Sequence, residues 1–265
     1  MKDESNKRFK FGENWKNYLA SINDEKITLS TAAISNFLKI DNLSGKSFLD
    51  AGSGSGLSSL SAWKLGAEVI SFDYDKDSVE CTRKLKEKYS KNDSKWNVLQ
   101  GSVLDKYFLK TLGEFDIVYS WGVLHHTGDI NQALNNITIP IKEEGLLFIA
   151  IYNDQGMISE YWRIIKKIYN THVLFKILLI MIYSPYFIFA RKLFHIIRGK
   201  KNIRGMSLWH DMLDWLGGYP FEVSTPENVT LYFTKKGYSL IKTHLCGKKM
   251  GCNEFLFRKN ASRTI

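Results

Sequence analysis

Cysteine and proline are scarce in this chain, and their scarcity excludes several kinds of protein. The 265 residues contain three cysteines and four prolines. The cysteines, Cys81, Cys246 and Cys252, are odd in number and far apart, without the paired spacing of a zinc site. We therefore expect free thiols in a reducing compartment, with no disulfide partner and no metal.

The first residues also show no recognisable targeting segment. The first eight residues, MKDESNKR, are charged and have no apolar stretch behind them. A secretory signal needs such a stretch, so we expect a cytoplasmic protein. The 44% hydrophobic content is ample for a globular core.

The longest apolar stretch, residues 173–190, is too interrupted to span a bilayer. A spanning helix needs about 20 apolar residues, and this stretch contains Lys176 and a break at Ser184-Pro185. Two interpretations remain. One is a pair of buried helices joined at Pro185, and the other is an interfacial segment that rests on anionic lipid at the inner face of a membrane. We favour the buried pair, because an inserted subdomain needs a core of its own.

Acidic residues are the minority among the charged ones. Asp and Glu number 27 against 37 Lys and Arg, which gives a net charge of +10. Such a surplus favours anionic partners: nucleic acid, phosphorylated metabolites or an anionic membrane. The charge by itself does not choose among them.

A glycine-rich turn is the strongest motif present. Residues 49–56 read LDAGSGSG, and Asp73 follows seventeen residues after the last glycine. Alternate glycines let a strand turn sharply into a helix and bring backbone N–H groups close to a ligand. An acidic side chain at the tip of the next strand can accept both hydroxyls of a ribose.

The rest of the chain alternates strands and helices, as in an α/β protein. We predict strands at residues 46–51, 67–73, 96–100, 115–120, 146–152, 238–245 and 253–258. Helices are predicted at 58–65, 79–89 and 131–141, and from Thr225-Pro226 to Gly237. Only a short loop joins the last two strands, so they must be antiparallel. The expected fold is a Rossmann-like, seven-stranded, mostly parallel sheet with an antiparallel last strand, plus a helical cap insertion.

A family resemblance rests on four of these features. The glycine run, Asp73, the segment FDIVYSWGVLHH at 115–126 and the terminal hairpin resemble class I S-adenosylmethionine-dependent methyltransferases, over residues 46–152 and again from about 225. The Val-Leu-His-His segment looks most like the small-molecule branch with quinone-biosynthesis and surface-glycan methyltransferases. A dehydrogenase is the alternative for a glycine run, but it would have G-x-G-x-x-G where this chain has G-x-G-x-G. The resemblance implies S-adenosylmethionine as cofactor.

By that resemblance, the cofactor lies across the ends of the strands. Asp50, Gly52 and Gly54 would follow its methionine part, and Gly56 would let the helix start close by. Asp73 would bind the ribose and Tyr74 would pack on the adenine edge. The remaining expected contacts are Ser102 and Val103 at the adenine, Ser120 and Trp121 at the end of the fourth strand, and Trp15 in a leading helix. Serine departs from the acidic residue usual at position 102, and Asp105 is its expected substitute.

Histidines supply the candidate general bases. Methyl transfer requires alignment of the acceptor and removal of a proton when the acceptor is a hydroxyl. His125 and His126 follow the fourth strand, and an unperturbed histidine pKa of about 6.5 suits a base at neutral pH. Either could instead shape the loop by bonding to backbone. His210, beside Asp211 and Asp214, is a third candidate as part of a proton relay.

The insertion divides the chain into three expected parts. Residues 1–45 would form a helical lid, 46–153 with 225–261 the cofactor-binding core, and 154–224 a helical cap that selects the acceptor. Arg204, Asp211 and Tyr219 are the candidate substrate-binding residues, with Arg204 suited to an anionic group.

These features together predict a methyltransferase that acts on a small molecule, at an oxygen of a metabolite or surface-glycan precursor. Alternatives are a lipid-linked quinone precursor at the membrane surface and a transfer RNA. DNA and RNA are not expected partners, because the fourth strand ends in Ser-Trp-Gly-Val and not in the Asn-Pro-Pro-Tyr type of loop that methylates base amines. A binding protein with a vestigial cofactor pocket is the non-enzymatic alternative.

Overall fold

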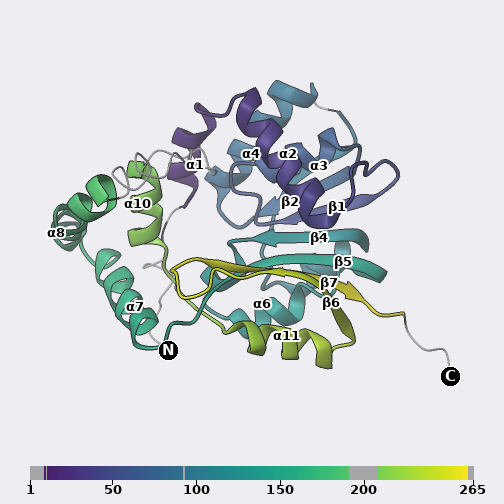
Figure 1. Ribbon diagram of the computed structural model, residues 1–265. Helices are drawn as coiled ribbons and strands as arrows, with labels where there is room; N and C mark the ends of the chain where they lie inside the picture. The colour runs from purple at the N-terminus through teal and green to yellow at the C-terminus, as the bar shows by residue number, and fades with distance from the viewer. Residues whose placement is uncertain (1–8, 10, 92, 191–207, 262–265) are drawn as a thin grey trace.

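The chain folds as a seven-stranded sheet covered by helices on both faces, in a computed structural model that describes residues 9, 11–91, 93–190 and 208–261 (Figure 1). The strands are β1 (Ser47–Ala51), β2 (Glu68–Asp73), β3 (Trp96–Gln100), β4 (Phe115–Trp121), β5 (Ile141–Tyr152), β6 (Tyr238–His244) and β7 (Cys252–Lys259). Their order across the sheet is β3-β2-β1-β4-β5-β7-β6. Because β7 is antiparallel to both of its neighbours and the other pairs are parallel, the predicted topology is confirmed.

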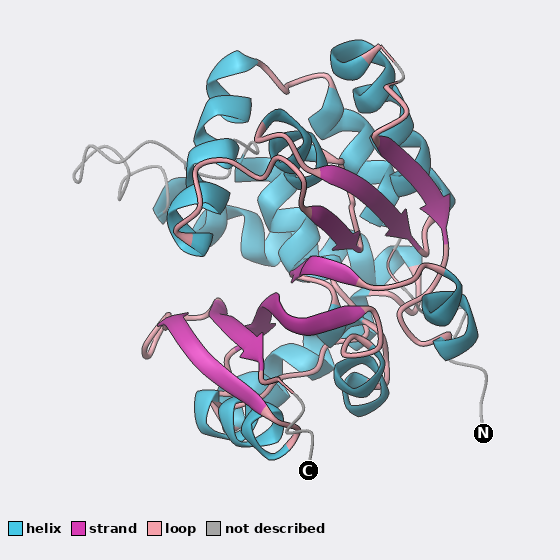
Figure 2. Ribbon diagram, turned by 90° about the vertical axis from the view of Figure 1, so that its right-hand side faces the viewer, coloured by secondary structure: helices cyan, strands magenta, loops and turns pink. Residues whose placement is uncertain are grey.

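Helices of the core pack on the two faces of this sheet. They are α2 (Asp24–Leu38), α3 (Leu57–Lys64), α4 (Lys76–Ser90), α5 (Lys106–Thr111), α6 (Ile130–Asn136) and α11 (Pro226–Lys235), with a short 3-10 helix, η2, at Leu124–His126. In Figure 1, α2, α3 and α4 lie above the sheet and α6 and α11 below it. Figure 2, from the side, shows the sheet as a twisted layer between the two groups of helices.

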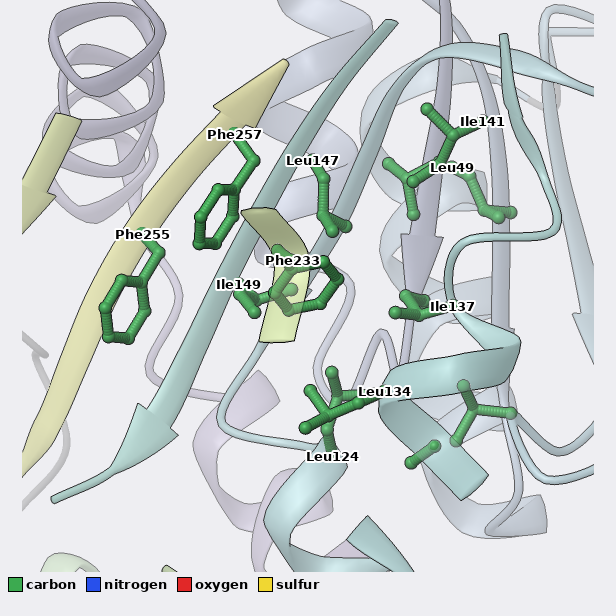
Figure 3. Packing of buried hydrophobic residues seen from close by; sticks show 14 of the residues in the cluster. Leu49, Leu124, Leu134, Ile137, Ile141, Leu147, Ile149, Phe233, Phe255 and Phe257 are labelled. Atoms are coloured by element: carbon green, nitrogen blue, oxygen red, sulfur yellow. The ribbon is translucent and has the colours of Figure 1, made fainter. Parts of the chain in front are cut away.

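Two apolar clusters hold these layers together. One lies between the sheet and α2 and α3, where Phe37 of α2 stacks on Phe148 of β5 with ring centroids 4.1 Å apart. The other fills the opposite face, where Phe233 of α11 packs 4.8 Å from Phe257 of β7 (Figure 3). Apolar residues on both faces of β4 and β5 are what a sheet buried on both sides requires.

The insertion is helical where the structure describes it. It contains α7 (Met157–Tyr169), α8 (Val173–Ser184), a π-helical turn η3 (Pro185–Ala190) and α10 (Leu208–Gly217). These helices lie to one side of the sheet, together with the N-terminal α1 (Phe11–Leu19) (Figure 1). The predicted break at Ser184-Pro185 is present as the end of α8.

Two expectations about local structure are wrong. The helix predicted at 131–141 ends at Asn136, because Pro140 has no N–H with which to continue it, and β5 begins at Ile141. The favoured burial of residues 173–190 also fails for α8, where Leu179 is the buried residue of the helix. No helix among the described residues reaches the length and hydropathy that crossing a bilayer demands.

Candidate functional site

The glycine run forms a tight turn between β1 and α3. Gly52, Gly54 and Gly56 have φ of +87°, +54° and +81°, values that L side chains rarely adopt. A Cβ atom added to Gly52 would lie 2.4 Å from a methyl group of Val123, and one added to Gly54 would lie 3.1 Å from the ring of Trp15. The glycines are therefore required both for the path of the backbone and for the close approach of its neighbours.

Asp73 lies against this turn, at the end of β2. Its Oδ2 accepts a hydrogen bond from the N–H of Gly54 at 2.9 Å, and its Oδ1 accepts one from the N–H of Asp75, also at 2.9 Å. A carboxylate has about four acceptor positions, so further donors can be bound. The structure thus brings together the two parts of the motif, the turn and the acidic side chain.

Asp50 has a different place from the one expected. Its carboxylate is 1% exposed and accepts a hydrogen bond from Ser59 Oγ of α3 at 2.5 Å. Ser59 accepts in turn from Ser71, and Ser71 from the indole of Trp96, so a buried chain of hydrogen bonds ties β1, α3, β2 and β3 together. Burial raises the pKa of Asp50 to about 7. This side chain fixes β1 to α3 beneath the turn.

The residues expected near the adenine lie after β2 and β3. Tyr74 is 58% exposed, Val103 is buried, and Ser102 Oγ accepts from the N–H of Leu104 at 3.1 Å. Ser102 also lines an open groove of about 640 Å³ together with α5 and α6 residues, among them Gln132. Asp105, the expected substitute acid, caps α5 by accepting from two backbone N–H groups.

At the end of β4 the two predicted residues bond to neighbouring strands. Ser120 Oγ donates to the carbonyl of Ala51 at 2.8 Å, and the indole of Trp121 donates to Glu254 of β7 at 2.8 Å. Ser120 is fully buried. Both side chains hold the strand ends in register next to the turn.

The N-terminal helix α1 lies over the glycine turn. Trp15 packs against Gly54, and the N–H of Gly12 donates to the Asp75 carboxylate at 3.1 Å. In the opposite direction, Asn14 Nδ2 donates to Asp214 of α10 at 2.6 Å. Of the predicted lid, α1 therefore joins the turn to the cap, whereas α2 is packed in the core.

The two histidines of η2 are held in different ways. His125 is fully buried, and its Nδ1 accepts from the N–H of Tyr152 at 3.3 Å. His126 Nδ1 lies 2.6 Å from the carbonyl oxygen of Pro220. Because a carbonyl can only accept, Nδ1 of His126 carries the hydrogen and Nε2 keeps the lone pair in the neutral ring. Nδ1 thus donates in His126 and accepts in His125, and each ring is held by a backbone group.

A returning segment, residues 219–224, supports the histidine loop, a contact that the sequence pattern does not specify. The N–H of Glu222 donates to the carbonyl of His125 at 3.0 Å. The carboxylate of Glu222 accepts from the N–H groups of Gly128 and Ile130, each at 3.1 Å, and burial raises its pKa. Tyr219, a predicted substrate contact, is buried, and its carbonyl accepts from the N–H of Phe9 at 3.0 Å.

Lys166 of α7 is a second feature that sequence reasoning missed. It is fully buried, donates to the carbonyl of Trp215 and lies 4.3 Å from the centre of the Trp215 ring. Burial lowers its pKa to about 7. Asn170, one turn later, donates to the carbonyl of Gly217 at 2.8 Å, so α7 binds the C-terminal end of α10.

The remaining predictions about the cap lie partly outside the described residues. Arg204 is among the residues that the structure does not describe, and the side chains of His210 and Asp211 are likewise outside the description. Within the described part of the chain, no group of three His, Cys, Asp or Glu side chains could hold a metal ion.

Comparisons with known proteins agree with this architecture. Residues 49–149 match the family model for a methyltransferase domain. A ubiquinone biosynthesis O-methyltransferase from Glaesserella parasuis is 30% identical over 115 residues, which are 43% of this chain and 49% of that protein. A ribosomal protein L11 methyltransferase from Helicobacter hepaticus is 29% identical over 143 residues, 53% of this chain and 41% of that protein. The chain thus spans about half the length, or less, of these curated relatives.

Solved structures share the fold over nearly the whole chain. Magnesium protoporphyrin IX methyltransferase from Synechocystis, solved with bound SAH, aligns with a TM-score of 0.54 at 13% identity, over 90% of this chain and 89% of that one. A putative sarcosine dimethylglycine methyltransferase from Galdieria sulphuraria aligns with a TM-score of 0.52 at 12% identity, over 87% and 84%. The family predicted from the glycine run is confirmed for residues 49–149, which match a methyltransferase domain, and the fold of the chain is that of the solved methyltransferases.

Proposed function

We propose that this chain is an S-adenosylmethionine-dependent methyltransferase that acts on a hydroxyl oxygen of a small molecule, with His126 as general base. The observation that carries the proposal is the close fit of the glycine turn to its surroundings. At Gly52 a single added carbon would meet Val123 at 2.4 Å, and the N–H of Gly54 is bound to Asp73. A turn kept free of side chains beside an acidic strand tip is suited to a ribose-bearing cofactor.

Three groups of residues would hold the cofactor. The backbone of the glycine turn would bind its methionine part, Asp73 would accept its ribose hydroxyls, and Ser102 with Val103 would meet its adenine. Trp15 would cover the turn from above. When bound, S-adenosylmethionine supplies a methyl group on a positively charged sulfur.

The chain's own contribution to the reaction is orientation and proton removal. The hydrogen bond from His126 Nδ1 to Pro220 fixes the ring and its tautomer, so Nε2 can take the proton of an acceptor hydroxyl. The aromatic rings around this histidine exclude water: Phe11 lies 4.9 Å and Tyr152 5.4 Å from it, centroid to centroid. His125, with its Nδ1 bound to backbone, is assigned the role of shaping the loop.

A metabolite or a surface-glycan precursor is the proposed acceptor, and an anionic one suits the positive charge of the chain. A lipid-linked quinone precursor is a second candidate. It is favoured by the name of the Glaesserella relative, a ubiquinone biosynthesis O-methyltransferase, and by the exposed apolar helix of the cap.

Calorimetric titration with S-adenosylmethionine tests the cofactor assignment. We expect binding by the full chain, and a dissociation constant at least about tenfold higher for Asp73→Ala, because a charge-assisted hydrogen bond contributes about 1.5–3 kcal/mol. Asp93→Ala, which removes a carboxylate before the start of β3, at the opposite edge of the sheet, is the matched control and should leave the affinity nearly unchanged.

Absence of binding to the full chain would overturn the proposal, and an unchanged constant for Asp73→Ala would overturn the ribose assignment. Incubation with labelled cofactor and a panel of phenols, sugars and carboxylic acids then tests the atom that is methylated. Methyl transfer confined to carboxylates or amines would contradict the choice of a hydroxyl.

A further inference from the structure

The cap exposes far more apolar side chain than the core does. Of the 22 large hydrophobic residues that are exposed among those the structure describes, 12 lie between Met157 and Tyr186. Elsewhere in the described chain such residues are scattered, which is normal for a globular surface. A concentration of this size marks an interaction site.

One stripe of α8 carries four of these twelve residues. Leu174, Ile177, Leu178 and Met181 follow one another at helical spacing and are 67%, 49%, 47% and 60% exposed. We call these four residues the docking face. The opposite side of the helix is the anchored one: Leu179 is buried in the cap, next to Trp162 and Met212. Figure 1 shows α8 as the outermost helix on its side of the molecule, with α7 and α10 behind it.

The positive charge of the chain is concentrated in the same stretch of sequence. Residues 161–207 contain ten Lys and Arg and no Asp or Glu, so the remaining residues hold 27 basic and 27 acidic side chains. The whole net charge of +10 therefore belongs to this stretch. On α8 itself, Lys176 lies on the side opposite the docking face, with its Nζ 5.6 Å from the centre of the Tyr169 ring.

We propose that the docking face of α8 rests on the surface of an anionic lipid bilayer. An apolar helical stripe inserts at the boundary between headgroups and acyl chains, and basic residues nearby are attracted by anionic headgroups. Both requirements are met by α8 and its flanking sequence. The helix has 12 residues and lies across the cap, which suits binding to a surface and is too short for a span.

Charge also argues against a second copy of the chain as the partner. A symmetric dimer brings the same surface of both copies together. Here that arrangement would bring together two copies of residues 161–190, which hold four basic and no acidic side chains, and like charges at an interface oppose association. An anionic bilayer covers the same apolar residues and neutralises the charge. This inference stands independently of the proposed methyl transfer.

Flotation with lipid vesicles tests the proposal. We expect the full chain to float with vesicles of phosphatidylglycerol and phosphatidylcholine in equal parts, and not with phosphatidylcholine alone. The double substitution Leu174→Gln with Met181→Gln should weaken the partition coefficient at least about tenfold through loss of apolar insertion. Raising the salt concentration should also weaken the partition of the unmodified chain, since salt screens the attraction between basic residues and anionic headgroups.

Leu231→Gln is the matched control, because Leu231 is 53% exposed and its helix, α11, lies below the sheet and away from α8 (Figure 1). It should float like the unmodified chain. Circular dichroism of each variant shows that it is folded, and the salt dependence of the unmodified chain gives an answer even if the double variant is not.

Equal flotation of the double variant and the unmodified chain would overturn the proposal, as would binding to phosphatidylcholine alone. Equal loss in Leu231→Gln would do the same. Sedimentation equilibrium distinguishes the alternative partner: a dimer that the double substitution converts to a monomer, without flotation of either, would assign the docking face to a second copy.

Discussion

The glycine turn and helix α8 stand at opposite extremes of packing within one chain. At the turn, single atoms decide what fits: Val123 and Trp15 leave no room for a Cβ on Gly52 or Gly54. On α8, most apolar side chains face outward and Leu179 alone is buried among the described residues of the helix. The contrast indicates that the turn is closely packed by the chain's own side chains, whereas α8 presents apolar side chains that the described part of the chain does not cover.

The largest effect is expected where core and cap meet, at His126. His126→Gln should lower turnover about 100-fold or more with cofactor affinity unchanged, because general-base catalysis contributes on the order of 10² to 10⁴. His125→Gln is the matched control and should mainly lower stability. Turnover at saturating cofactor, together with calorimetry, distinguishes the two, and equal turnover in both variants would end the assignment of the base.

The tightness of the turn is tested by Gly52→Ala. The left-handed φ and the contact with Val123 together should cost about 3 kcal/mol in the free energy of unfolding, measured in urea. Gly113→Ala has a similar φ of +79° but nothing within 4 Å of the added carbon, so it should cost about 1 kcal/mol. If the two variants were equally stable, crowding at the turn would not be what requires glycine. Truncation of Val123 to Ala should restore part of the loss in Gly52→Ala.

The buried charge in the cap should be visible in the pH dependence of stability. The pKa of Lys166 is about 7 in the folded chain, whereas the ordinary pKa of a lysine is 10.5. Between these two pH values the unfolded chain therefore binds more protons than the folded chain. Stability should then rise with pH, by up to about 1.4 kcal/mol per pH unit, relative to Lys166→Met. Lys167→Met, at the exposed neighbouring position, should run parallel to the unmodified chain. Urea unfolding at pH 7, 8 and 9 measures the difference, and parallel curves for Lys166→Met would contradict it.

The smallest effect on stability is expected at the hydrogen bond between the N-terminal helix α1 and the cap. Asn14→Ala should cost about 1–2 kcal/mol by removing a hydrogen bond to the Asp214 carboxylate. A cycle with Asp214→Ala and the double variant isolates the pair, and the losses should not add. Additive losses would show that α1 and α10 are held together by other contacts.

The turn and the sheet could be predicted from the sequence because the signals that form them are local. The three glycines, Asp73 and the short loop before β7 each determine their own geometry within a few residues. The tautomer of His126 could not be predicted, since its partner Pro220 is 94 residues away. The bond of Asp50 to Ser59 could not be predicted, because a carboxylate before a glycine turn looks the same whether it faces a ligand or a serine. The exposure of α8 was missed because an apolar run by itself does not say what covers it.

The two ends of the insertion lie side by side. Asn153 forms a parallel bridge with Ser224, and the N–H of Ser224 donates to the carbonyl of Tyr152 at 3.0 Å. An insertion whose two ends lie next to each other can be lengthened, exchanged or shortened at little entropic cost to the domain that carries it. Replacement of the whole cap would thus change the acceptor that we propose it binds. The sheet and its glycine turn would stay as they are.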